Sequence, residues 1–178
     1  WIVDAASGEA QPAADTDALG AAFNTVYAST PLVTLGPVRW SPDGARVMVW
    51  GGSSTTRPPQ LWPLLVDLAG SSVSALNLPM LANDTPDKRM LRPIQAAWLP
   101  DGAQVMALVT GRDRATDETP LDAANPQARM SVYLADASGG DAQLFGHLPL
   151  MASAGMFPAV WSAQGAVIVN GYALQTGE

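Results

Sequence analysis

Residues able to carry out enzyme chemistry are scarce in this chain. It contains one histidine, His147, which has no carboxylate next to it, and it contains no cysteine. No Gly-x-Ser-x-Gly nucleophile elbow is present, and no glycine-rich phosphate loop precedes a helix. Thiol nucleophiles, disulfides and zinc sites built from cysteine or several histidines therefore lack their residues. We expect no catalytic, cofactor-binding or metal-binding residues and predict that the chain is not an enzyme.

Charged side chains gather in two segments. The first lies within 111–130 and contains Arg112, Asp113, Arg114, Asp117, Glu118 and Asp122. Its carboxylates suit a hard cation such as Ca²⁺, but the Asp-x-Asp-x-Asp-Gly spacing is absent and two prolines interrupt the segment, so a solvated loop is favoured. The second segment is mixed in charge and contains Asp84, Asp87, Lys88, Arg89 and Arg92. It suits either simple exposure to solvent or recognition of a charged partner.

The composition narrows the class of protein further. The 178 residues are 48% hydrophobic, which is enough for one ordinary domain with a core. The net charge of −7 opposes binding to nucleic acid, which requires a basic face, and to anionic lipid. No apolar run approaches the roughly 18 residues of a membrane span. We therefore expect neither a nucleic-acid partner nor membrane insertion.

The sequence repeats itself, and the repeat predicts the fold. Segment 38–49, which contains Trp-Ser-Pro-Asp-Gly, recurs at 96–107 with Trp-Leu-Pro-Asp-Gly and more weakly at 159–169. Proline at the second turn position and glycine at the fourth suit a type I turn closed by a left-handed glycine. The strands that follow are apolar at nearly every position, which is typical of strands buried on both faces. Each copy is therefore predicted to be a β-hairpin.

A second motif alternates with the first. Segment 1–8, Trp-Ile-Val-Asp-Ala-Ala-Ser-Gly, resembles 64–70 and 133–139, and 172–178 begins a further copy. Each copy is predicted to be a strand followed by a tight polar turn. Together the two motifs predict repeated four-stranded antiparallel meanders in an all-β fold. A short helical piece is expected only within 15–28.

These repeats resemble the blades of TolB-like, WD-repeat-like β-propellers. The resemblance covers nearly the whole chain: a blade end at 1–10, full blades at 38–76 and 96–145, and a partial blade at 159–178. It implies one propeller segment with an incomplete ring, because closed propellers have four to eight blades. We expect the chain to be a segment of a larger propeller; the alternative is that several copies assemble into one ring.

The meander predicts where a binding site lies. The tight turns share one end of each blade, and most of the long connections share the other, which we call the loop end. Because long loops on a rigid scaffold usually carry binding function, we expect partners to bind there. The candidate residues for partner binding are Trp62, Met80, Lys88, Arg89, Arg112, Arg114 and Met151.

The tryptophans divide into two groups. Trp40, Trp98 and Trp161 occupy equivalent repeat positions, so they are predicted to pack within or between blades. Trp62 lies outside the repeat and is predicted to be a surface anchor.

Three functions from different classes remain. The favoured one is a non-enzymatic interaction scaffold whose partners are other proteins or the remaining blades of the same propeller. The second is the propeller portion of a prolyl-oligopeptidase-like hydrolase, which requires a catalytic domain elsewhere. The third is a propeller that binds a small ligand or sugar through converging aromatic side chains. The acidic, cysteine-free composition and the resemblance imply a bacterial periplasmic or extracellular location.

Overall fold

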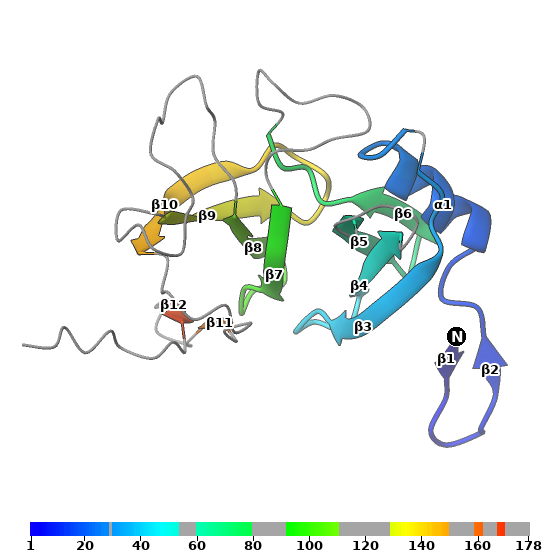
Figure 1. The fold of residues 1–178 in the computed structure, drawn as a ribbon. Helices are drawn as coiled ribbons and strands as arrows, with labels where there is room; N and C mark the ends of the chain where they lie inside the picture. The colour runs from blue at the N-terminus through cyan, green and yellow to red at the C-terminus, as the bar shows by residue number, and fades with distance from the viewer. Residues whose placement is uncertain are drawn as a thin grey trace, which may run out of the picture. The chain divides into compact units, whose positions relative to one another are not determined.

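The computed structural model describes residues 1–28, 30–53, 60–79, 92–110, 129–149, 159–161 and 167–169 (Figure 1). Among them, strands dominate and one α-helix is present. The chain divides into two compact units, of which unit 1 contains the described residues up to Leu76 and unit 2 contains those from Asn77 onwards. The predicted all-β class is confirmed. The assignment of the whole chain to a single propeller segment stays a prediction.

Unit 1 is built on a four-stranded antiparallel meander. Its strands β3 (Thr34–Trp40), β4 (Arg46–Ser53), β5 (Gln60–Asp67) and β6 (Ser72–Ala75) lie side by side in chain order. The central strand β4 is buried through Val47, Met48 and Val49, as its uninterrupted apolar sequence predicts. The meander is therefore the four-stranded antiparallel sheet that the first full repeat predicts, and it is compatible with a propeller blade.

Unit 2 repeats this architecture. Strands β7 (Arg92–Trp98), β8 (Gln104–Thr110), β9 (Arg129–Asp136) and β10 (Gln143–Pro149) form a second antiparallel meander in chain order. Its centre is β8, in which every residue from Val105 to Val109 is no more than 1% exposed. Trp98 pairs with Val105 in the same register in which Trp40 pairs with Val47. The sequence repeat is thus a structural repeat.

The turn after each first strand explains the Pro-Asp-Gly signature. Gly44 has φ 70° and Gly102 has φ 68°, a left-handed conformation that glycine adopts without steric cost. The Gly44 amide donates to the Ser41 carbonyl at 3.0 Å, and the Gly102 amide donates to the Leu99 carbonyl at 3.0 Å. Each turn is thereby closed tightly, as predicted.

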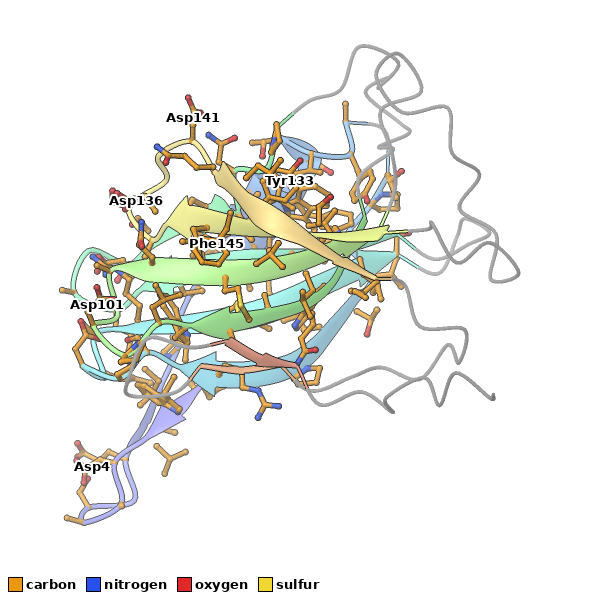
Figure 2. All side chains as sticks on the ribbon, turned by 90° about the vertical axis from the view of Figure 1, so that its left-hand side faces the viewer. Asp4, Asp101, Tyr133, Asp136, Asp141 and Phe145 are labelled. Atoms are coloured by element: carbon orange, nitrogen blue, oxygen red, sulfur yellow. The ribbon has the colours of Figure 1, made fainter. Side chains whose placement is uncertain are left out.

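The aspartate of the second motif also has a local structural role. The side chains of Asp4, Asp67 and Asp136 each accept backbone N–H groups two or three residues further on. This pattern is an Asx-type turn, which substitutes a side-chain acceptor for a backbone carbonyl. Figure 2 shows Asp101 and Asp136 at the same end of the unit 2 sheet, where the β7–β8 and β9–β10 turns lie. The tight turns therefore share one end of the blade.

Two further sheets have only two strands within the described residues. In unit 1, β1 (Ile2–Val3) pairs with β2 (Ala10–Gln11), and Asp4 forms the turn that follows β1. In unit 2, β11 (Ala159–Trp161) pairs with β12 (Val167–Val169), with Trp161 opposite Val167. The turn of the first hairpin thus resembles the turns after β5 and β9, and the pairing of the second resembles that of β3 with β4 and of β7 with β8.

The packing prediction for the repeated tryptophans holds in one blade and fails in the other. Trp98 is 9% exposed, whereas Trp40 is 53% exposed. The β-strand that carries Trp40 is an edge strand whose residues are all exposed. The prediction that Trp40 is packed is therefore wrong. A position in the sequence repeat does not ensure that another element lies over the side chain. The side chain of Trp161 lies outside the described residues.

Candidate interaction site

The loop end is the part of each blade opposite the tight turns. In unit 1 the described residues there are the end of β4, the start of β5 and the helix α1 (Thr16–Asn24) with the segment after it. Most of the candidate residues predicted from the sequence fall outside the described residues, namely Met80, Lys88, Arg89, Arg112, Arg114 and Met151. At the loop end, the structure therefore describes the strand ends and the helix, and the predicted binding residues themselves stay untested.

Trp62 is a core residue, and its prediction as a surface anchor is wrong. Its side chain is 0% exposed, and its indole Nε1 donates to the Leu76 carbonyl at 2.8 Å. The ring of Tyr27 meets it edge-on, with the two centroids 5.9 Å apart. A buried indole needs a partner for its single N–H, and the Leu76 carbonyl supplies one. Trp62 thus holds β5 to the chain that leaves β6.

Helix α1 is positioned by its own apolar stripe. Asp15 caps its N-terminus by accepting the Asp17 amide at 3.2 Å, which satisfies one of the free amides of the first turn. The buried residues of the helix and of the turn that follows recur at three- and four-residue spacing and are Leu19, Ala22, Phe23, Val26 and Tyr27. This spacing places them on one face, and α1 uses that face against β5 and β6 (Figure 1). The expected helical piece within 15–28 is confirmed.

A glycine in β4 makes room for the helix. A Cβ atom at Gly51 would stand 2.9 Å from Leu64 Cδ1, 3.0 Å from Leu32 Cδ1 and 3.2 Å from Phe23 Cδ2. The first of these distances is shorter than real contacts allow, so a larger residue would push the helix or β5 away. Gly51 pairs with Trp62 across the two strands. The sequence alone does not show this pairing, because it follows from the register of β4 and β5, so sequence reasoning had no signal for the burial of Trp62.

Charged side chains at the tight-turn end of unit 1 take part in hydrogen bonds and an ion pair. The hydroxyl of Ser41, which is 3% exposed, donates to a carboxylate oxygen of Asp43 and accepts the Arg46 amide at 2.9 Å. The hydrogen bond from Ser41 and then that from the Ala45 amide lower the pKa of Asp43 below its ordinary 3.8. Arg46 also lies 3.7 Å from a carboxylate oxygen of Asp67, a partly exposed ion pair of small energetic effect.

The lowered pKa of Asp43 predicts how this turn responds to acid. Since the folded-state pKa lies below 3.8, the ionised carboxylate stabilises the fold above pH 3.8, and this contribution is lost as the pH falls through the folded-state value. We expect Asp43→Asn, which keeps an acceptor oxygen but cannot ionise, to lower the melting temperature at pH 6 and to have a smaller effect at pH 3. Thermal unfolding followed by circular dichroism measures both values.

One result of this measurement would contradict the predicted role of the Asp43 charge. A difference in melting temperature that is the same at pH 3 and pH 6 would show that the charge of Asp43 does not strengthen its hydrogen bonds. Asp15→Asn serves as the control, because it removes the same charge at a different local acceptor, the helix cap that binds the Asp17 amide at 3.2 Å.

Two further observations concern the described residues as a whole, the absence of a candidate metal cluster and the exposure of apolar side chains on edge strands. Within these residues, no group of three or more His, Asp or Glu side chains is placed to hold a metal ion. Exposed apolar side chains do occur on two edge strands, Leu35, Val38 and Trp40 on β3 and Leu144 and Phe145 on β10. Sequence reasoning missed these residues because the exposure of an apolar side chain on an edge strand depends on whether a neighbouring element covers it, which the strand's own sequence does not show. None of the helices in the described part of the chain has the length and apolar character needed to cross a membrane.

Comparison with known proteins finds no matching family model and no matching curated protein. What the structure shows is an all-β chain with two antiparallel four-stranded sheets whose register repeats.

Proposed function

We propose that this chain is a non-enzymatic protein-interaction scaffold. In this proposal it is a TolB-like or WD-repeat-like propeller segment of a larger protein, or a subunit of a larger complex, that binds partners through its loop end. The observation that carries the proposal is the asymmetry of the blades. Both four-stranded meanders have tight turns of few residues at one end, and their long connections leave from the other. Loops of this kind on a rigid sheet are where binding usually occurs.

The packing beneath the loop end supports a scaffold role. Phe23, Tyr27 and Trp62 form a continuous buried aromatic cluster, with ring centroids 5.2 Å and 5.9 Å apart. None of the three is more than 3% exposed. Their rings are therefore used to fix α1 on the sheet, and they are not presented to a sugar or other small ligand. A hydrolase-associated propeller would in turn require a Gly-x-Ser-x-Gly domain, which this chain does not contain.

Charge reversal at the loop end tests the proposal. We expect the double substitution Arg89→Glu and Arg112→Glu to reduce capture of partner proteins from a lysate of the source cells by about tenfold, because interfaces depend on a few charged and aromatic residues. Quantitative mass spectrometry of the retained proteins measures this. Arg46→Glu, at the tight-turn end, is the matched control and should change capture by less than about twofold.

If the double variant retains the same proteins in the same amounts as wild type, partners do not bind through the charges of the loop end. The resemblance to propellers of the cell envelope and the acidic composition support a periplasmic or extracellular location as part of the same proposal. Fractionation of the source cells tests that part.

A further inference from the structure

The turn between β3 and β4 contains an Asp-Gly pair, Asp43 and Gly44, that is open to solvent. Both residues are exposed, and a Cβ atom at Gly44 would meet no atom beyond its chain neighbours within 4 Å. In such a pair the glycine nitrogen can attack the carboxyl carbon of the aspartate before it, because glycine has no side chain to hinder the approach. The sequence and the exposure of this turn therefore make Asp43 a candidate for spontaneous isomerisation.

The reaction needs no reagent other than water. The Gly44 nitrogen forms a bond to Cγ of Asp43, the bond from Cγ to one carboxyl oxygen breaks, and the carboxyl OH leaves with the amide proton as water. A second water molecule then opens the five-membered succinimide at either carbonyl carbon. Attack at the main-chain carbonyl gives isoaspartate, in which the main chain runs through the former side chain. Because OH leaves only from the protonated carboxyl group, the ionised carboxylate resists the first step.

The Ser41 hydroxyl opposes this first step. Its oxygen lies 2.5 Å from Oδ1 of Asp43 and 3.0 Å from the Arg46 carbonyl oxygen. A hydroxyl has a single proton to donate, and the shorter contact, to the charged acceptor, is the stronger of the two. The Ala45 amide donates to the same Oδ1 atom at 3.0 Å. Both hydrogen bonds favour the ionised carboxylate and hold it in one position.

The pKa of Asp43 follows from the same contacts. The hydrogen bond from Ser41 is the largest cause of its lowering below 3.8, the Ala45 amide is the next, and the charge of Arg46 adds less. The Ser41 residue is 3% exposed, so water has little access to compete for its hydroxyl. Ser41 is therefore the main group that keeps this carboxylate in its unreactive form.

The turn between β7 and β8 shows that the hydroxyl is not needed to close a turn of this kind. Leu99 stands where unit 1 has Ser41, yet the Gly102 amide donates to the Leu99 carbonyl at 3.0 Å, and Gly102 has the left-handed φ of 68°. The Asp101 carboxylate accepts the Ala103 amide at 3.0 Å. A side chain without a hydroxyl thus suffices for the turn, and the contact of Ser41 with the carboxylate is an addition to it.

We propose that Asp43–Gly44 is a site of succinimide formation and isomerisation, and that Ser41 is the positioning residue that slows this reaction in the folded chain. Isoaspartate formation lengthens the main chain in the turn that joins β3 to β4, next to the pair of Trp40 with Val47. Ser41 thereby preserves this hairpin as the protein ages. The inference is independent of the proposed function, since it holds whether or not partners bind at the loop end.

Substitution of Ser41 tests the proposal. The full chain, as wild type and as Ser41→Ala, is incubated at neutral pH, and isoaspartate at Asp43 is followed over time by mass spectrometry with electron-transfer fragmentation. Trypsin releases the turn as the peptide 40–46, because Arg39 and Arg46 flank it. We expect Ser41→Ala to raise the rate of isomerisation at Asp43 by at least about threefold, the effect of losing one hydrogen bond.

Two further variants separate this role from a general loosening of the sheet. Ser41→Thr keeps the hydroxyl and should keep the wild-type rate. Asp67→Ala removes the side chain that accepts the Ala69 and Gly70 amides in the neighbouring turn, and it should leave the rate at Asp43 unchanged. In guanidinium chloride, where the chain is unfolded, wild type and Ser41→Ala should isomerise equally fast.

The outcomes that would overturn the proposal are equally specific. One is the same rate at Asp43 in folded wild type and folded Ser41→Ala. Another is an equal rise in Asp67→Ala, which would show that any loosening of this end exposes Asp43 to the reaction. If Ser41→Ala fails to fold by circular dichroism, Ser41→Cys replaces it, because a thiol is similar in shape but only a weak donor, and the same expectations apply.

Discussion

Truncation of Trp62 to alanine is expected to lower the free energy of unfolding by about 3–5 kcal/mol, the usual cost of removing a fully buried large aromatic side chain. The side chain is 0% exposed and meets Tyr27 edge-on, so its removal leaves a cavity that the strand cannot close. It also leaves the Leu76 carbonyl without its indole donor, which adds to the cost. Urea denaturation followed by circular dichroism measures the change.

Two companion variants separate the contributions. Trp62→Phe keeps most of the ring but removes the donor to Leu76, and we expect it to cost about 1–2 kcal/mol. Leu61→Ala changes the neighbouring residue, whose side chain is 46% exposed, and should cost about 0.5 kcal/mol. If Trp62→Ala were no more destabilising than Leu61→Ala, the buried position of the indole would be wrong.

Replacement of Phe23 by alanine is expected to cost about 3–5 kcal/mol and to loosen α1 from the sheet. Phe23 is 0% exposed, and its ring centroid lies 5.2 Å from that of Tyr27. Its Cδ2 atom would lie 3.2 Å from a Cβ atom at Gly51. An isolated nine-residue helix has little stability in water, so α1 depends on this packing. Hydrogen exchange should therefore rise in α1 well before it rises in β4.

The control for this prediction is the same substitution at an exposed phenylalanine. Phe145→Ala, at a residue 61% exposed on β10, should change stability by about 0.5 kcal/mol. Unchanged exchange in α1 of the Phe23→Ala protein would show that the helix is held by its other buried residues, Leu19, Ala22, Val26 and Tyr27.

The two four-stranded sheets could be predicted from the sequence because their determinants are local. The Pro-Asp-Gly turn requires a left-handed glycine at Gly44 and Gly102, and the aspartate of the second motif supplies its own acceptor within three residues. Short apolar strands between such turns have few other ways to pair. Strand order follows from these turns, and the structure shows the chain-order pairing that the repeat predicts.

Burial of individual residues could not be predicted in the same way, because it depends on contacts distant in sequence. Trp62 is buried by a helix some forty residues earlier in the chain, and its position outside the repeat gave no sign of this. Trp40 and Trp98 precede the same kind of turn, but the side chain of Trp98 is buried and that of Trp40 is exposed. The candidate partner-binding residues other than Trp62 lie outside the described residues, so the loop-end site stays a prediction.

The chain-order pairing of both meanders has a consequence for how the protein folds during synthesis. Each strand pairs with the strand before it and the strand after it, so no pairing within a blade waits for a distant segment. Contacts between near neighbours lower the entropic barrier and speed folding. A nascent chain can therefore complete the β3–β6 sheet before β9 has left the ribosome, so that the two four-stranded sheets form one after the other during synthesis.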